Sequence, residues 1–359
     1  MRDMSRRRAA KRRQQLMRKY AKIAVVLVLI IAIVVVVARV KNSKNSGADD
    51  TESANVPELV SEMVVGTTTE NKQDTADGSA DDTADANVDY YTAHETDSTF
   101  QLINEVNSDY AIVIDEETGD ILAEKNPRER MSPASMTKIL TVLVAAEHID
   151  PAQLDDTVVI SQDAIEFAFA NGCSNAGFIE GETVTVRDLF YATILPSGGE
   201  AAGQLAIYIA GSTEAFADMM NEKLAELGCG ETSHFTNCVG IYGEDHYSTV
   251  YDIAMIMKAA MDNEICRPVL SAHVYTTTIT EQNPEGLICS NWFLRRIEDK
   301  MESGEVIGAK TGFVDQAGSC AASYEQSESG RTYICVTASA NSSWSCIYDH
   351  VDLYKTFAQ

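Results

Sequence analysis

The sequence predicts an α+β fold, with an antiparallel sheet that carries helices on both faces and a helical subdomain beside it. Three observations indicate this class. A hairpin pattern comes first, helical patterns fill the middle of the chain, and strand patterns follow before one closing helix. Strands and helices that are segregated along a chain are typical of α+β domains. The folded part is expected to begin near Phe100, and about 260 residues are enough to bury one sizeable core.

The first strands are predicted from two short apolar segments, residues 110–115 and 121–124. The polar sequence Glu117-Thr118-Gly119-Asp120 lies between them, and a glycine-containing turn between apolar segments is typical of a β-hairpin. An apolar run over residues 139–144 follows. We expect a helix there that begins near Ser135.

Apolar residues at helical spacing predict four further helices, over residues 184–195, 201–210, 213–227 and 248–261. The sequence Pro196-Ser197-Gly198-Gly199 separates the first two, and the last two are predicted to be amphipathic. Strand patterns then cover residues 274–280, 304–311, 319–324 and 332–338, and a helix is predicted over 345–357.

Charge divides the chain into three parts. Residues 1–44 have a net charge of +12, residues 49–98 have −13, and the remainder has −25 of a total of −26. Because this acidic remainder of the chain repels the phosphates of nucleic acids, we expect no nucleic-acid partner. The segment 41–98 is rich in Asp, Glu, Thr and Ser and has little apolar periodicity, which predicts a disordered linker. The folded domain is therefore placed at residues 99–359.

A membrane anchor is predicted before this linker. The 16 residues from Ile23 to Ala38 are all apolar, and the segment 23–40 reaches the lower length limit for a membrane span. A basic tail, residues 1–22, precedes it and an acidic stretch follows it, which favours a cytoplasmic N-terminus and an exported remainder. A cleaved signal peptide is the alternative, although no small-x-small cleavage pattern follows Ala38.

Cysteines and histidines carry little functional signal. The eight cysteines lie at positions 173, 229, 238, 266, 289, 320, 335 and 346, and we favour buried free thiols over disulfides, which an exported compartment would permit. No CxxC pair, HExxH motif or close histidine pair occurs, so no metal and no cofactor are expected. His246 is expected in a loop or at the start of a helix.

Three short segments carry the chemistry. The first, Ser135-Met136-Thr137-Lys138, places a hydroxyl and an amine on one face of a helix, about one turn apart. The second, Ser197-Gly198-Gly199, lies at a break between two helices, and the third, Lys310-Thr311-Gly312, lies in an apolar strand. A serine beside a neutral lysine is a nucleophile that needs no histidine.

The order and spacing of these segments, with 62 and 113 residues from Ser135 to Ser197 to Lys310, resemble the S-x-x-K, second serine and K-T-G motifs of penicillin-binding proteins. From about residue 100 onward the chain resembles the low-molecular-mass members, the serine-type D-Ala-D-Ala carboxypeptidases. Segments without catalytic residues, such as 216–221 and 235–237, share the resemblance. It implies a fold like that of β-lactamases and transpeptidases, a peptidoglycan stem peptide as substrate, and β-lactam antibiotics as ligands. With the predicted anchor, it implies a single-pass bacterial membrane protein whose catalytic domain is extracytoplasmic.

The resemblance also implies the catalytic roles. Ser135 would attack the carbonyl of the penultimate D-alanine and form an acyl-enzyme that water hydrolyses. Lys138 would be the base, with Lys310 as the second cation that helps to keep its amine neutral. Ser197 would relay a proton to the leaving amine.

The substrate-binding roles implied in the same way fall on the third motif. Lys310 and Thr311 would bind the terminal carboxylate, and Gly312 would let the substrate lie close to the strand. The backbone N–H groups of Ser135 and Phe313 would bind the oxyanion.

One position departs from the family pattern. Gly199 stands where the second motif usually ends in asparagine, so another group must replace the missing amide, and Gly199→Asn is expected to preserve or improve labelling by penicillin. Glu200 stands in place of a usual aspartate and is expected to be structural. Two alternatives stay open. The first is a β-lactamase, but class A enzymes of that kind need a glutamate with an asparagine four residues later, and Glu231 and Asn237 have a different spacing. The second is a non-catalytic peptidoglycan-binding or sensor module.

Overall fold

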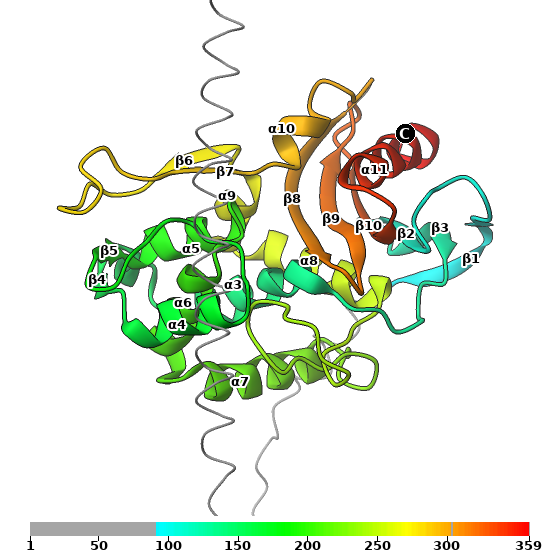
Figure 1. The fold of residues 1–359 in the computed structure, drawn as a ribbon. Helices are drawn as coiled ribbons and strands as arrows, with labels where there is room; N and C mark the ends of the chain where they lie inside the picture. The colour runs from blue at the N-terminus through cyan, green and yellow to red at the C-terminus, as the bar shows by residue number, and fades with distance from the viewer. Residues whose placement is uncertain (1–90, 303, 359) are drawn as a thin grey trace, which may run out of the picture. The chain divides into compact units, whose positions relative to one another are not determined.

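The centre of the fold is a six-stranded sheet (Figure 1). The computed structural model describes residues 91–302 and 304–358, which belong to one unit of the chain, residues 77–359. Across the sheet the strands follow the order β1-β3-β2-β10-β9-β8. Their bounds are β1 His94–Gln101, β2 Tyr110–Asp115, β3 Asp120–Lys125, β8 Glu305–Val314, β9 Gly318–Gln326 and β10 Thr332–Ala340.

The predicted hairpin is confirmed. β2 and β3 pair antiparallel around a turn that contains Gly119, whose φ of 76° lies in the left-handed region that glycine adopts readily. The other neighbouring strands are antiparallel too, except that β1 pairs parallel with β3. The α+β class therefore holds, but the expectation of a purely antiparallel sheet is wrong at this edge.

β1 also corrects the predicted domain boundary. The predicted linker ends at residue 98, whereas β1 begins at His94, so the boundary falls inside a strand. Most residues of β1 are polar and exposed, which is why it shows no apolar alternation in the sequence.

The predicted tail 1–22, the anchor 23–40 and residues 41–90 of the linker lie outside the described residues. Within residues 91–302 and 304–358, no helix is long and apolar enough to span a membrane.

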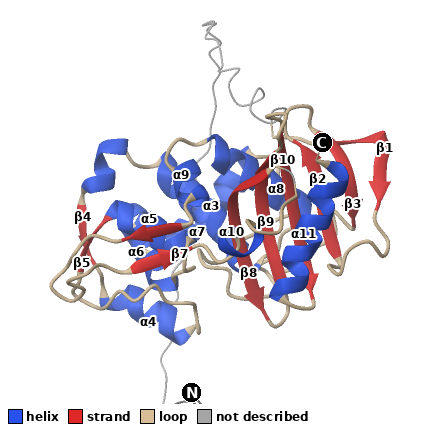
Figure 2. Ribbon diagram, turned by 90° about the horizontal axis from the view of Figure 1, so that it is seen from above, coloured by secondary structure: helices blue, strands red, loops and turns tan. Residues whose placement is uncertain are grey.

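Helices cover both faces of the sheet, as predicted (Figure 2). α11 (Ser343–Phe357) packs on β9 and β10, and α8 (Val250–Asp262) packs on β2, β9 and β10. Ile112 and Ile114 of β2 belong to the core cluster around α8, and Val113 belongs to the cluster around α11. Because successive strand residues point to opposite faces, a strand that is buried on both faces is apolar without interruption.

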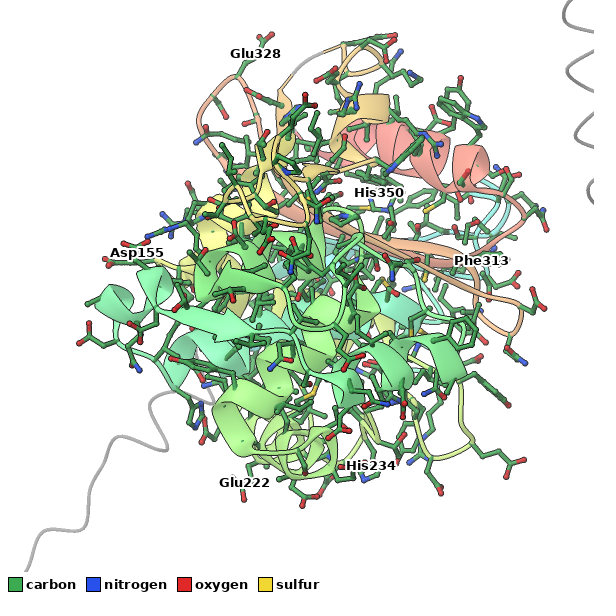
Figure 3. The ribbon with its side chains drawn as sticks, turned by 60° about the vertical axis from the view of Figure 1, so that its left-hand side comes forward. Asp155, Glu222, His234, Phe313, Glu328 and His350 are labelled. Carbon is green, nitrogen blue, oxygen red and sulfur yellow. The ribbon has the colours of Figure 1, made fainter. Side chains whose placement is uncertain are left out.

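A buried histidine joins α11 to the sheet. His350, labelled in Figure 3, places Nδ1 2.7 Å from Ser323 Oγ and Nε2 3.0 Å from Thr337 Oγ1. Burial lowers the pKa of His350 to about 4, so the ring is neutral at pH 7. Both ring nitrogens therefore have a partner on the sheet, Ser323 of β9 and Thr337 of β10.

The helical subdomain lies beside the sheet (Figure 1, Figure 2). Its helices are α3 Thr137–Glu147, α4 Gln162–Ala170, α5 Val186–Ile194, α6 Gly199–Ala210, α7 Thr213–Glu226 and α9 Cys266–Ser271. Short elements complete the described fold: the 3-10 turns η1 Ala134–Met136 and η2 Pro151–Asp155, helix α10 Leu294–Ile297, and the strand pairs β4 Thr157–Val159 with β5 Thr183–Thr185 and β6 Val274–Thr276 with β7 Ile288–Ser290.

Three predicted elements differ from the structure. The helix predicted over 184–195 begins at Val186, because Thr185 caps it in a reciprocal pair of hydrogen bonds with Asp188. The strand predicted over 274–280 ends at Thr276. α8 is not amphipathic: every residue from Val250 to Met261 is buried, since the helix lies between the sheet and other helices. The other predicted helices and strands are confirmed, with small shifts at their ends.

Candidate active site

Ser135 lies in the turn η1, directly before α3. Ala134 in this turn has a φ of 44°, a conformation that is strained for a residue with a side chain. Lys138 follows in the first turn of α3 and is only 1 % exposed. Its Nζ lies 3.0 Å from Ser135 Oγ. The hydroxyl and the amine therefore meet, as their spacing predicts.

Burial sets the protonation of this amine. It lowers the pKa of Lys138 to about 8, while Cys173, Cys238 and the Glu200 carboxylate act in the opposite direction. With a pKa of about 8, roughly a tenth of the molecules carry a neutral amine at pH 7. In that form the nitrogen can accept the proton of Ser135.

A loop carbonyl also binds the amine. Lys138 Nζ donates to the backbone oxygen of Val239 at 2.9 Å, and Ser135 Oγ lies 3.4 Å from the same oxygen. Val239 belongs to the loop between α7 and α8, and this loop is held by Asn237. Asn237 Oδ1 accepts three successive backbone N–H groups, those of residues 239, 240 and 241, at 3.2, 2.8 and 3.0 Å.

The sequence does not predict Val239 or Asn237 as site residues. Val239 contributes only its carbonyl group, which every residue type has, so no sequence signal marks it. Asn237 does carry a signal, because it lies in the segment 235–237 that shares the family resemblance.

The second and third motifs also meet. Ser197, in the turn between α5 and α6, has a φ of 63° and is therefore in the left-handed region. Lys310 of β8 is 2 % exposed, and its Nζ donates to Ser197 Oγ at 3.0 Å and to the Thr311 carbonyl at 2.7 Å. Burial and the nearby charge of Lys138 hold the pKa of Lys310 well below its ordinary value.

A cleft of about 600 Å³ joins the motifs. Five of the seven predicted site residues line it: Ser135, Ser197, Thr311, Gly312 and Phe313. Phe313, labelled in Figure 3, is 63 % exposed. The two lysines lie behind the serines that they contact, and β8 is the edge strand of the sheet on this side. Thr311 is thus presented to the cleft directly, whereas Lys310 acts from behind Ser197.

Two glycines allow the Ser135 turn to pack closely on its surroundings. A Cβ atom on Gly312 would lie 2.9 Å from Ser135 N and 3.0 Å from Pro133 O. A Cβ atom on Gly240, whose φ is 86°, would lie 1.8 Å from Ala134 O. Gly312 is therefore needed for contact with the nucleophile turn itself, which adds to the expected role of admitting substrate.

The start of α6 shows what stands in place of the missing asparagine. A Cβ atom on Gly199 would lie 2.4 Å from the Cβ of Cys173 and 3.1 Å from its Sγ. A side chain on Gly199 therefore requires Cys173 to move, and this packing argues against the prediction that Gly199→Asn preserves labelling. Glu200 is structural, as expected, because its buried Oε1 accepts the N–H groups of Ala176 and Gly177 at 2.6 and 2.9 Å.

His246 lies in a loop, as expected, and it supports the first helix turn after Ser135. Its Nδ1 accepts the N–H of Thr236 at 3.0 Å, so Nε2 carries the proton and donates to Thr137 Oγ1 at 2.9 Å. Burial lowers the pKa of His246 to about 4. The ring is neutral at pH 7 and positions Thr137, which precedes Lys138.

The eight cysteines are all free thiols in the structure, and seven of them are buried. Among the described residues, no group of three or more His, Cys, Asp or Glu side chains is arranged to hold a metal ion. Cys173 is the half-buried cysteine, and it is the one beside Gly199.

Two serines, each in contact with a buried lysine, lie beside the edge strand β8. This arrangement defines an acyl-serine transferase, the class that contains the penicillin-binding proteins. Within that class, the chain belongs to the D-alanyl-D-alanine carboxypeptidase family, whose model matches residues 94–342. The matched segment contains all three motifs. The resemblance predicted from the sequence is therefore confirmed.

Relatives and solved structures agree with this assignment. The chain is 34% identical over 224 residues to the D-alanyl-D-alanine carboxypeptidase DacF of Bacillus subtilis, covering 62% of this chain and 54% of that protein. It is 33% identical over 217 residues to DacD of Escherichia coli, covering 57% and 53%. The DD-transpeptidase of Streptomyces K15 has a similar structure, with a TM-score of 0.64 and 28% identity, covering 71% of this chain and 98% of that one. The chain spans about half the length of these two curated relatives.

Proposed function

We propose that the protein is a serine-type D-Ala-D-Ala carboxypeptidase that removes the terminal D-alanine from peptidoglycan pentapeptides and is acylated by penicillin. The observation that carries this proposal is the pairing of Lys138 Nζ with Ser135 Oγ at 3.0 Å, in a cleft that also contains the Lys310–Ser197 pair. Membership of the family supports the choice of substrate.

In the acylation step, the neutral amine of Lys138 takes the proton of Ser135 as Oγ bonds to the carbonyl carbon of the penultimate D-alanine. The backbone N–H groups of Ser135 and Phe313 receive the oxyanion, and one such donor typically contributes about 3 kcal/mol to transition-state stabilisation. The tetrahedral intermediate then expels the terminal D-alanine, whose nitrogen must gain a proton.

Ser197 is suited to deliver that proton. Its Oγ accepts a hydrogen bond from Lys310 Nζ, so its own hydrogen can point into the cleft toward the leaving nitrogen. Thr311, on the cleft surface, binds the carboxylate of the departing D-alanine, and Lys310 strengthens this contact from behind. Ser197 regains a proton from Lys310 Nζ, and Lys138 passes the proton of Ser135 on to Lys310, so that the amine of Lys138 is neutral again. Water then gives a proton to Lys138 as its oxygen bonds to the acyl carbon, and that proton returns to Ser135 Oγ as the acyl bond breaks.

Labelling by fluorescent penicillin, with mass mapping of the acylated peptide, tests the proposal. We expect one label on Ser135 and none in Ser135→Ala. An unlabelled wild-type domain would contradict both the carboxypeptidase and the β-lactamase alternative and leave the non-catalytic wall-binding module. Release of D-alanine from a pentapeptide, compared with hydrolysis of nitrocefin, separates the two enzymes, and we expect the first to dominate.

Transfer of the acyl group to an amine is a second candidate activity. It is favoured by the similarity to a structure described as a DD-transpeptidase, of which the chain covers 98%. Adding an amine acceptor such as glycylglycine to the pentapeptide assay tests it. A new amide product at the expense of the tetrapeptide would support transfer, and an unchanged product ratio would contradict it.

We also propose that residues 23–40 anchor the protein in the cell membrane as a single span, with the basic tail 1–22 in the cytoplasm and the catalytic domain outside. The apolar run and the charge asymmetry of the sequence support this topology. Fractionation of cells that express the full chain, with N-terminal sequencing of the product, tests it. A protein that begins after residue 40 and is found in the soluble fraction would indicate a cleaved signal peptide instead.

A further inference from the structure

A second pocket, with a volume of about 300 Å³, adjoins the segments that carry the proposed oxyanion donors. Ser132 lines this pocket and lies three residues before Ser135. Gln316 also lines it and lies three residues after Phe313. Three residues of extended chain span at most about 11 Å, so the wall of the pocket begins within this distance of both donors. The pocket is therefore close enough to receive part of a substrate bound at Ser135.

The direction of a bound peptide leads toward this pocket. β8 is an edge strand, so an extended peptide can lie along it and add a strand to the sheet. In the proposed mechanism Thr311 binds the carboxylate of the leaving D-alanine, and the N–H of Phe313 binds the oxyanion. The acyl part of the substrate therefore continues past Phe313, toward the turn in which the N–H of Ala317 donates to the Val314 carbonyl at 3.0 Å. Gln316 lies in this turn.

The third residue of the stem peptide has the length to reach the pocket. Its Cα lies one backbone step, about 3.8 Å, from that of the penultimate D-alanine. A long unbranched side chain, as in diaminopimelate or lysine, adds about 6 Å. Together these lengths match the distance from the oxyanion donors to the wall of the pocket.

The pocket presents a cation and an anion that are free to bind a ligand. Arg130 and Glu244 line it, and neither makes an ion pair with any residue that the structure describes. The guanidinium of Arg130 is nevertheless held in place, because its Cζ lies 3.9 Å from the centroid of the Tyr247 ring. Tyr247 in turn exchanges backbone hydrogen bonds of 2.9 and 3.0 Å with His234. A stacked guanidinium is suited to bind a carboxylate through two parallel hydrogen bonds.

A strained residue also lines the pocket. Ser339, near the end of β10, has a φ of 62°, in the left-handed region. Its N–H and its Oγ both donate to the Ala317 carbonyl, at 3.1 and 3.4 Å. Such residues cluster at active sites and at sites that hold ligands. Of the three other described non-glycine residues with a positive φ, Ala134 and Ser197 belong to the proposed active site.

We propose that this pocket binds the side chain of the third residue of the stem peptide and selects one that carries both a carboxylate and an ammonium group, as meso-diaminopimelate does. Arg130 binds the carboxylate, and Glu244 binds the ammonium. Lysine at the same position offers only the ammonium, so it leaves the Arg130 guanidinium without a ligand. The inference rests on the proposed function and deepens it, because it names the class of stem peptide that the active site accepts.

Two pentapeptides that differ only in the third residue test the selection. We expect kcat/KM for release of D-alanine to be about tenfold to a hundredfold higher with meso-diaminopimelate than with L-lysine, as is typical of hydrogen bonds between charged groups. A diaminopimelate peptide whose distal carboxylate is amidated should behave like the lysine peptide. A preference near 1 in the wild-type enzyme, or full activity with the amidated peptide, would overturn the proposal.

Arg130→Gln should bring this preference close to 1. Arg128→Gln is the matched control, because Arg128 is also exposed and stacks on Tyr251 at 3.9 Å, but it is not among the residues that line the pocket. The control removes the same charge and the same kind of ring contact, and it should keep the preference. Labelling by penicillin shows whether each variant is folded at the active site. A preference that is retained in a labelled Arg130→Gln variant, or lost equally in both variants, would contradict the role of Arg130.

Glu244→Gln should have a different signature. Both peptides carry the ammonium group, so kcat/KM falls about threefold to tenfold for each of them while the preference stays. Asp245→Asn removes the neighbouring exposed carboxylate, which does not line the pocket, and should change neither value. Equal losses in the two variants would contradict the role of Glu244.

A binding measurement separates this proposal from the proposed function. Ser135→Ala in the full chain cannot be acylated, and calorimetry gives its affinity for tetrapeptides that end at the penultimate D-alanine. We expect the diaminopimelate tetrapeptide to bind about tenfold more tightly than the lysine tetrapeptide, and Arg130→Gln in the same background to remove the difference. Equal affinities would overturn the proposal, even for an enzyme that releases D-alanine. Preferential binding by a protein whose wild type releases no D-alanine would instead contradict the proposed function and support the assignment of the pocket.

Discussion

The amine of Lys138 and the carbonyl oxygen of Val239 lie 2.9 Å apart, although 101 residues separate them in the chain. This bond connects the proposed base to the loop between α7 and α8. The reactivity of Ser135 should therefore depend on how firmly that loop is held, and Asn237 holds it through three hydrogen bonds.

Asn237→Ala is expected to slow acylation by tenfold or more. The substitution leaves three N–H groups without their acceptor, and each such bond contributes about 1 kcal/mol to stability, so the loop loosens around Val239. The rate of penicillin labelling and the thermal unfolding temperature measure the effect. Asn237→Asp is the matched control, since it keeps the accepting oxygen and should lose much less. Equal losses in the two variants would contradict the role of Oδ1.

Acylation should rise about tenfold per pH unit below pH 8 and level off above it. The neutral amine of Lys138 is the reactive form, and burial lowers the pKa of Lys138 to about 8 from its ordinary value of 10.5. Initial rates of labelling between pH 5.5 and 9.5 measure the profile. Lys138→Arg should abolish labelling at every pH in this range, because guanidinium stays charged. A rate that rises without levelling off up to pH 9.5 would contradict a lowered pKa of Lys138.

How much of this site the sequence predicts depends on the kind of group involved. Ser135 and Lys138 lie within one helical turn, so their spacing alone predicts that they meet. Ser197 and Lys310 are 113 residues apart, and only the resemblance to a known family predicts that they meet. The carbonyl of Val239 could not be predicted, because a backbone group leaves no residue-specific signal.

The same distinction holds for the fold. The hairpin of β2 and β3 and the strands β8 to β10 are predicted, since glycine-containing turns and apolar segments mark them locally. β1 is missed because it lies at an edge of the sheet, where most of its side chains face solvent. The packing of Cys173 on Gly199 is missed for a further reason: it depends on the path of a loop, and nothing in either residue type specifies that path.

Acid should destabilise the domain through His246. Its pKa is lowered to about 4 in the folded state from 6.5, so the unfolded chain binds more protons between these values, and stability falls as pH decreases from about 7 to 4. At pH 5 the cost is about 2 kcal/mol relative to pH 7. Urea unfolding at the two pH values measures it. His246→Asn should reduce this dependence, whereas His350, which titrates in the same direction, should account for much of what is left. An unchanged dependence in His246→Asn would contradict the assignment.

Gly240 and Gly211 provide a matched pair for the packing of the Ser135 turn. Both have left-handed backbones, with φ of 86° and 82°, but a Cβ atom on Gly240 would lie 1.8 Å from Ala134 O, whereas a Cβ on Gly211 would meet nothing within 4 Å. Gly211→Ala should therefore cost only the conformational strain, about 1 kcal/mol, and keep normal labelling. Gly240→Ala must displace the η1 turn or the Val239 loop, so it should lose labelling as well as stability. Thermal unfolding and labelling of the two variants measure the difference, and normal labelling of a folded Gly240→Ala variant would show that the turn tolerates displacement.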